Sequence, residues 1–183
     1  MDGRFFREWV FSMIVYLQII DSSENQSKFE KLYYAYRDVM YHAAFKILHN
    51  EYDAEDAVHQ AFLKIAEIID DVDGTLCPRT KSFTIIITER KALDILRYNK
   101  QHPTFSFDEE LGLVVEYEGP NELTFNLTRL PAIYRQVLLL KHCHGYSSAE
   151  TARILGLSEA NVIKIDQRAK RKLKLLYTEG TEK

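Results

Sequence analysis

The chain has 183 residues, with 24 basic and 27 acidic residues, and is 46% hydrophobic and 12% aromatic. This composition is typical of a globular protein with one or two compact cores, and it excludes disordered, collagen-like and disulfide-stapled classes. The longest apolar stretch, residues 9–20, is too short to span a membrane, and no cleavage site for a signal peptide follows it. We therefore expect a cytoplasmic protein without membrane insertion. Two cysteines, Cys77 and Cys143, have no CxxC spacing and are expected to be reduced thiols.

The charge is divided into segments along the chain. Residues 1–75 hold 14 acidic and 7 basic residues, whereas residues 76–105 hold 2 acidic and 6 basic ones. Residues 106–125 hold 6 acidic and no basic residues, and residues 126–183 hold 5 acidic and 11 basic ones. Two basic segments on either side of an acidic one indicate two surfaces for a polyanion, although solvated helix faces would give the same pattern.

Helical periodicity begins in the first half of the chain. Apolar residues recur every three or four positions from Phe29 to Ile47, which predicts an amphipathic helix. A second helix is expected to begin with Asp53 as its N-terminal cap and to run to about Ile68. Because so few residues separate these helices, we expect them to pack antiparallel. Residues 70–74 are expected to form a loop.

The segment from Lys81 to Lys100 contains a β-branched run, residues 83–88, that propensity alone would assign to a strand. We expect a helix instead, because no Gly, Pro or Asn separates this run from the helical pattern that follows, and a lone strand would have no partner.

The C-terminal half follows an acidic segment with linker composition, residues 101–125. A helix is expected to open at Pro131. Ser147 and Glu150 form a capping box for a short helix, and Gly156 ends it. A longer basic helix follows from Glu159 to about residue 177. A short helix, a glycine turn and a basic helix predict a DNA-binding helix-turn-helix.

These motifs carry a family resemblance. The sequences at 134–140, 145–152 and 154–162 resemble region 4 of the sigma-70 family of RNA polymerase sigma factors. Those at 53–66 and 91–97 resemble region 2 of the same family. The order of the motifs and the short linker are similar to the small extracytoplasmic-function (ECF) members.

The resemblance implies an all-α protein of two helical domains joined by an acidic linker. The expected divisions are an N-terminal extension at 1–26 starting at Met1 or Met13, a region 2-like domain at 27–100, the linker at 101–125, a region 4-like domain at 126–177 and a tail at 178–183. It implies core RNA polymerase, through its β′ clamp and β flap, and promoter DNA as partners, with an anti-sigma factor as a further partner.

The resemblance also implies site residues. The polymerase-binding set is Asp53, Glu55, Asp56, His59, Gln60 and Lys64. The set for the minus-10 promoter element is Arg90, Lys91, Asp94, Arg97 and Lys100. The set for the minus-35 element is Ser158, Asn161, Lys164, Gln167, Arg168, Arg171 and Lys172.

Three residues depart from the family pattern, which usually has basic residues where Ile163 and Ile165 stand and an aliphatic core residue where Asp166 stands. One interpretation is that the last helix is rotated, with Ile165 in the core and Asp166 exposed, where its charge would repel phosphate. Two alternatives to a fully functional sigma factor therefore stay open: a sigma-like protein with weakened minus-35 recognition, and a stand-alone helix-turn-helix regulator.

An enzyme is not indicated by the sequence. Asp56 and His59 have the spacing of a carboxylate-histidine metal motif, but a second such motif on another helix is required, and the nearest pair, Asp38 and His42, has the wrong spacing. No nucleophile, phosphate or dinucleotide motif is present, so we expect no catalytic residue, no metal and no cofactor.

Overall fold

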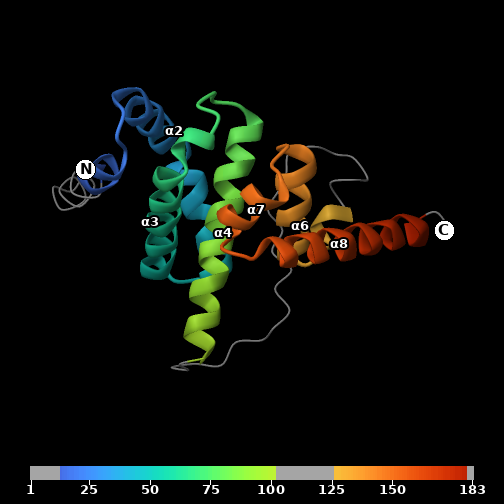
Figure 1. The fold of residues 1–183 in the computed structure, drawn as a ribbon. Helices are drawn as coiled ribbons and strands as arrows, with labels where there is room; N and C mark the ends of the chain where they lie inside the picture. Colours follow the sequence, from blue (N-terminus) through green and yellow to red (C-terminus); the bar gives the residue numbers. More distant parts are fainter. Residues whose placement is uncertain (1–12, 102–125, 181–183) are drawn as a thin grey trace. The chain divides into compact units, whose positions relative to one another are not determined.

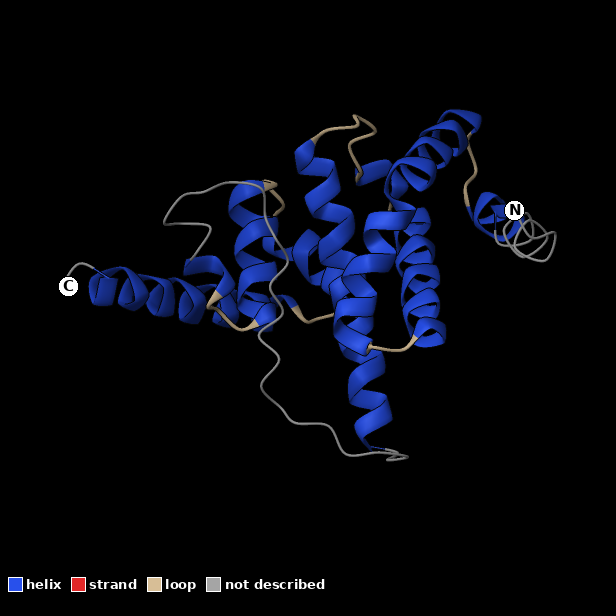
Figure 2. Cartoon of the chain, turned by 180° about the vertical axis from the view of Figure 1, so that it is seen from behind, coloured by secondary structure: helices blue, strands red, loops and turns tan. Residues whose placement is uncertain are grey.

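The computed structural model describes residues 13–101 and 126–180, and the regular structure within those ranges is entirely helical (Figures 1 and 2). The chain divides into two compact units, with the division between Tyr98 and Asn99. The prediction of an all-α protein with two helical domains is confirmed. The expected acidic linker lies outside the described residues, except for its first residue, Gln101.

Unit 1 is built around α2 (Ser23–Leu48) and α3 (Glu51–Glu67), which pack against each other. Only two residues join them: His49 has a left-handed backbone, φ 51°, and Asn50 is extended and caps α3 by accepting a hydrogen bond from the backbone N–H of Asp53. The expectation that Asp53 caps this helix was wrong, because the helix begins two residues before it. The reversal lets the apolar faces of both helices meet.

The core of unit 1 is rich in aromatic side chains. Phe29 and Phe62 are fully buried, and the ring of Tyr33 packs at a tilt against that of Phe62, with ring centroids 4.6 Å apart. Tyr16 joins this cluster 5.3 Å from Phe29, because residues 13–19 form a helix whose Met13 and Tyr16 are buried. The packed core therefore includes residues that precede the first helix expected from the sequence.

The segment between α3 and the last helix of unit 1 is held by Lys28 of α2. It contains a short 3-10 turn, η1 (Ile69–Asp71). The ammonium of Lys28 donates hydrogen bonds to the carbonyls of Ile69 at 2.7 Å and Val72 at 3.2 Å. A cation at the C-terminal end of a helical segment satisfies carbonyls that have no partner within the helix. This contact joins the turn that follows α3 to α2.

The last helix of unit 1 is α4 (Pro78–Gln101). Its β-branched run is helical, as predicted, and residues 83–88 are all buried. The hydroxyls of Thr84 and Thr88 donate to the backbone carbonyls of Lys81 and Thr84, so burying them leaves no polar group unpaired. Burial of this run outweighs its intrinsic preference for a strand. Proline at the first helical position lets α4 begin three residues earlier than we expected.

Unit 2 contains α6 (Ala132–Leu138), a π-helical turn η2 (Leu139–Cys143), α7 (Ser148–Leu155) and α8 (Glu159–Gly180). The predicted capping box is present: the hydroxyl of Ser147 accepts from the backbone N–H of Glu150, whose carboxylate accepts from the backbone N–H of Ser147. Gly156, with φ 65°, ends α7 in the left-handed conformation that favours glycine. The helix-turn-helix expected from the sequence is therefore formed by α7 and α8.

The core of unit 2 lies where α6 and α7 pack on α8. Its fully buried side chains include Val137 and Leu140 before the helix-turn-helix and Val162 and Ala169 on α8. Small and branched residues at these positions let the helices approach closely. Among the helices in the described ranges, none has the length and hydropathy to cross a membrane.

Candidate nucleic-acid and protein interfaces

The outward face of α3 carries the six side chains expected to bind polymerase. Glu55 and Asp56 are exposed, and the other four, Asp53, His59, Gln60 and Lys64, are half-buried. The amide of Gln60 donates to the carboxylate of Asp56 at 3.0 Å, one helical turn away. The acids lie toward the N-terminal end of α3, where the helix dipole stabilises negative charge. The structure therefore brings the six residues together on one polar face, separate from the buried apolar face of the helix.

His59 differs from the rest of this face because it has a partner from outside α3. Its Nδ1 lies 2.6 Å from the hydroxyl of Tyr16, and their rings are 5.2 Å apart. Burial raises the pKa of Tyr16 above its ordinary value, so the phenol keeps its proton. Tyr16 was missed from the sequence because no motif includes it and 43 residues separate it from His59. It lies in an apolar stretch, which is the one signal the sequence contains.

The polar face of α4 is partly neutralised by its own residues. Asp94 lies 3.5 Å from the guanidinium of Arg90 and 2.9 Å from that of Arg97. Burial lowers the pKa of Arg90, and its side chain is only slightly exposed. Arg97 is exposed, whereas Lys91 and Lys100 are half-buried. Asp94 is thus an internal bridge between two arginines.

An exposed aromatic side chain follows Arg97 on α4. Tyr98 is not among the residues expected to bind DNA, yet it lies on the solvent side next to this exposed cation. Aromatic rings next to cations form the kind of surface on which single-stranded bases stack. The sequence signal for Tyr98 was its position beside Arg97, but burial could not be read from the sequence.

The seven residues expected to read duplex DNA are all exposed, six on the solvent face of α8 and one directly before it: Ser158, Asn161, Lys164, Gln167, Arg168, Arg171 and Lys172. The hydroxyl of Ser158 also accepts from the backbone N–H of Asn161, at 3.3 Å, at the start of the helix. Side chains of hydrogen-bonding and cationic types along one helix face suit contacts to base edges and phosphates.

The register of α8 corrects the rotation considered from the sequence. Asp166 is buried, together with Val162 and Ala169, and was wrongly expected to be exposed in that interpretation. Ile165 is half-buried and does not replace it, while Ile163 is 43% exposed. The helix keeps the usual buried positions, and one of them holds a carboxylate.

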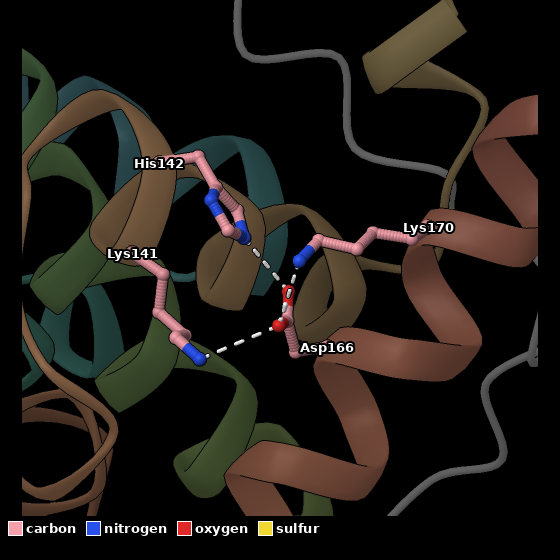
Figure 3. A network of polar contacts seen from close by, with 4 residues as sticks. All are labelled: Lys141, His142, Asp166 and Lys170. Carbon is pink, nitrogen blue, oxygen red and sulfur yellow. Dashed lines mark hydrogen bonds and ion pairs between the residues drawn. The ribbon is translucent and has the colours of Figure 1, made fainter.

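Four residues, which we call the Asp166 cluster, explain how that carboxylate is buried (Figure 3). Its oxygens lie 3.3 Å from Nζ of Lys141, 2.9 Å from Nε2 of His142 and 3.1 Å from Nζ of Lys170. Burial alone would raise the pKa of Asp166, but these hydrogen bonds outweigh it and lower the pKa below its ordinary value. The carboxylate is therefore ionised at neutral pH.

The π-helical turn η2 supplies two members of the cluster. In η2 the backbone N–H of His144 donates to the carbonyl of Leu139, five residues earlier, which widens the helix at its end. Lys141 and His142 both reach α8 from this turn (Figure 3). The sequence did not reveal the cluster, because its members are separated by 24 and 25 residues and meet only through packing.

Comparison with solved structures finds sigma factors of low sequence identity. The sigma factor RpoE in complex with the anti-sigma factor NepR from Bartonella quintana has a TM-score of 0.43 and 19% identity, covering 78% of this chain and 91% of that one. CnrH in complex with the cytosolic domain of CnrY has a TM-score of 0.40 and 21% identity, covering 92% of this chain and 97% of that one.

Comparison with protein families and curated proteins is more specific. The model of Sigma-70 region 2 matches residues 32–102, and that of Sigma-70, region 4 matches residues 125–173. The ECF RNA polymerase sigma factor SigM of Bacillus subtilis (strain 168) is 24% identical over 82% of this chain and 96% of its own length. SigW of the same organism, also an ECF RNA polymerase sigma factor, is 27% identical over 75% of this chain and 82% of its own length.

The two family models match the two structural units in the order in which the sequence motifs occur. Together they cover about two thirds of the chain, and the relatives match along most of their own length. The chain therefore belongs to the sigma-70 family, as an RNA polymerase sigma factor of the small ECF type that directs transcription initiation.

Proposed function

We propose that the outward face of α3 is the surface through which this sigma factor binds the clamp of core RNA polymerase. The observation that supports the proposal is the exposure of Glu55 and Asp56 on a helix whose apolar face is fully used in the core. The helix dipole stabilises acids at this end of α3, and an exposed acidic face also complements a basic partner surface.

On α4 we propose that Arg97 and the half-buried Lys91 and Lys100 contact the backbone of the minus-10 element, with Tyr98 stacking on an unpaired base. Asp94 would orient Arg90 and Arg97 and would make no contact with DNA itself, because its carboxylate already bonds to both guanidinium groups. Ser158 and the six exposed residues on α8 would read the minus-35 element in the major groove. The β flap and an anti-sigma factor stay predictions of the family resemblance.

We further propose that the protein works in the cytoplasm, where core polymerase and promoter DNA are found. Its task there is binding, and it carries out no chemical reaction of its own.

The α3 proposal is tested by charge reversal. Asp56→Arg should weaken binding to core polymerase by about tenfold, because it replaces an attractive charge by a repulsive one in the interface. Glu30→Arg is the matched control, since Glu30 is exposed on α2, in the same unit. Fluorescence titration with core polymerase should show weakening for Asp56→Arg alone, while circular dichroism shows equal helical content. Equal affinity of both variants and the parent would exclude this face as the dock.

A further inference from the structure

The Asp166 cluster gathers basic side chains around one buried acid within the most basic part of the chain. Residues 126–183 hold 11 basic and 5 acidic residues, a surplus that favours binding to any DNA through phosphate contacts. Two of those 11 basic residues, Lys141 and Lys170, contact Asp166, and His142 adds a third hydrogen bond.

The carboxylate and its partners differ in exposure. The side chain of Asp166 is 9% exposed, whereas that of Lys170 is 53% exposed and that of Lys141 is 18% exposed. The acid therefore lies beneath the surface and holds the ends of basic side chains that reach solvent. A phosphate that approached these ammonium groups would have to compete with a carboxylate that is already in contact with them.

The place of Lys170 on α8 makes this competition relevant to DNA binding. Lys170 lies three residues after Gln167, so the two are neighbours on the helix surface, and it directly precedes Arg171. Both neighbours are exposed and belong to the set proposed to contact the minus-35 element. Lys170 therefore borders, at Gln167, the set that is proposed to contact phosphates.

We propose that Asp166 withholds Lys141 and Lys170 from DNA phosphates and thereby limits the sequence-independent affinity of α8 for DNA. Asp166 is on this account a positioning residue that acts through the two lysines and touches no DNA. Binding by unit 2 then depends on the exposed residues that read sequence, and less on charge alone. The inference rests on the proposed function of α8 as the DNA-binding helix.

The experiment measures the salt dependence of binding to a duplex of random sequence, using the full chain. Each lysine that meets a phosphate contributes about 0.9 to the log–log slope of affinity against salt. In the parent, Lys170→Gln should leave the slope unchanged, because Lys170 is already held by Asp166. Lys164→Gln, which changes an exposed lysine on the same helix, should lower the slope by about 0.9.

The same substitutions in an Asp166→Asn background complete the test. Asp166→Asn alone should make the affinity more dependent on salt, increasing the magnitude of the slope by up to about 1.8, because two lysines are released. In that background Lys170→Gln should lower the slope by about 0.9, as Lys164→Gln does in both backgrounds. The comparison of Lys170→Gln with Lys164→Gln in the parent needs no change at Asp166. The proposal is therefore testable even if Asp166→Asn fails to fold.

Two results would overturn the inference, and they are distinguishable. If Lys170→Gln lowers the slope of the parent as much as Lys164→Gln does, Lys170 is not withheld, although α8 still binds DNA. If neither substitution changes the slope in the parent, Lys164 and Lys170 both meet no phosphate, which contradicts the proposed DNA contact of Lys164 on α8 together with the inference.

Discussion

The hydroxyl of Tyr16 lies 2.6 Å from Nδ1 of His59, joining the helical segment before α2 to the polar face of α3. Tyr16 also packs against Phe29, Tyr33 and Phe62, the aromatic core of unit 1. The segment that contains Tyr16 thus supports the face proposed to bind polymerase, both by covering the core beneath it and by a direct hydrogen bond.

Removing this hydroxyl should destabilise unit 1. Tyr16→Phe keeps the ring in the core but removes one hydrogen bond, which should cost about 1 kcal/mol of unfolding free energy. For a unit of this size the melting temperature should fall by about 4–8 °C. Tyr52→Phe is the matched control, because Tyr52 is 84% exposed and should tolerate the change. Equal melting temperatures for both variants would show that the Tyr16–His59 contact contributes no stability.

Ile163→Arg tests the outward position of Ile163 on α8. Because this side chain is partly exposed, an arginine should be tolerated without loss of stability. A new contact to a phosphate or a guanine should tighten minus-35 binding by about 1–3 kcal/mol. The salt slope should rise by about 0.9 if the contact is to a phosphate. Thermal unfolding and a salt titration of one variant measure both effects. A lower melting temperature would contradict the exposed position of Ile163 in the register described above. Unchanged minus-35 binding would show that residue 163 does not reach the major groove.

The Asp166 cluster should give unit 2 an acid-sensitive component of stability. The pKa of Asp166 is lower in the folded chain than its ordinary value of 3.8, so its charge stabilises the fold above about pH 4. This stabilisation is lost as the pH falls from that ordinary value through the lower folded pKa. The difference in melting temperature between the parent and Asp166→Asn should therefore narrow on acidification from pH 6 to pH 3. A difference that stays constant over this range would contradict the role of the charge.

The predictable parts of the structure are those that local patterns determine. The apolar periodicity after Phe29 was sufficient to predict α2 and α3. The Ser147–Glu150 capping box was sufficient to predict α7 and, with it, the helix-turn-helix. Each of these signals depends on residues a few positions apart. The β-branched run in α4 was also assigned correctly, from the continuous pattern that follows it. Asp53 was mistaken for a helix cap because Asn50 is an equally good cap three residues earlier, and propensity does not choose between them.

Contacts between distant residues could not be predicted. The partner of His59 and the burial of Asp166 depend on which helices pack against each other. The π-helical turn η2 could not be predicted either, because no sequence pattern distinguishes it from an ordinary helical turn. Asp166 was interpreted as a reason to rotate α8, since a lone acid in a core is costly. The cost is offset by Lys141, His142 and Lys170, which are all polar residues that the sequence alone would place on the surface.

The central claim is that this chain directs core RNA polymerase to promoters through both of its units. The most direct test is reconstitution of the full chain with core polymerase on a library of genomic promoter fragments, followed by sequencing of the transcripts. We predict transcripts that need the chain and that start downstream of a shared pair of minus-35 and minus-10 elements. No transcript above the level of core polymerase alone, from a folded chain that binds duplex DNA without polymerase, would contradict the claim and indicate a stand-alone regulator.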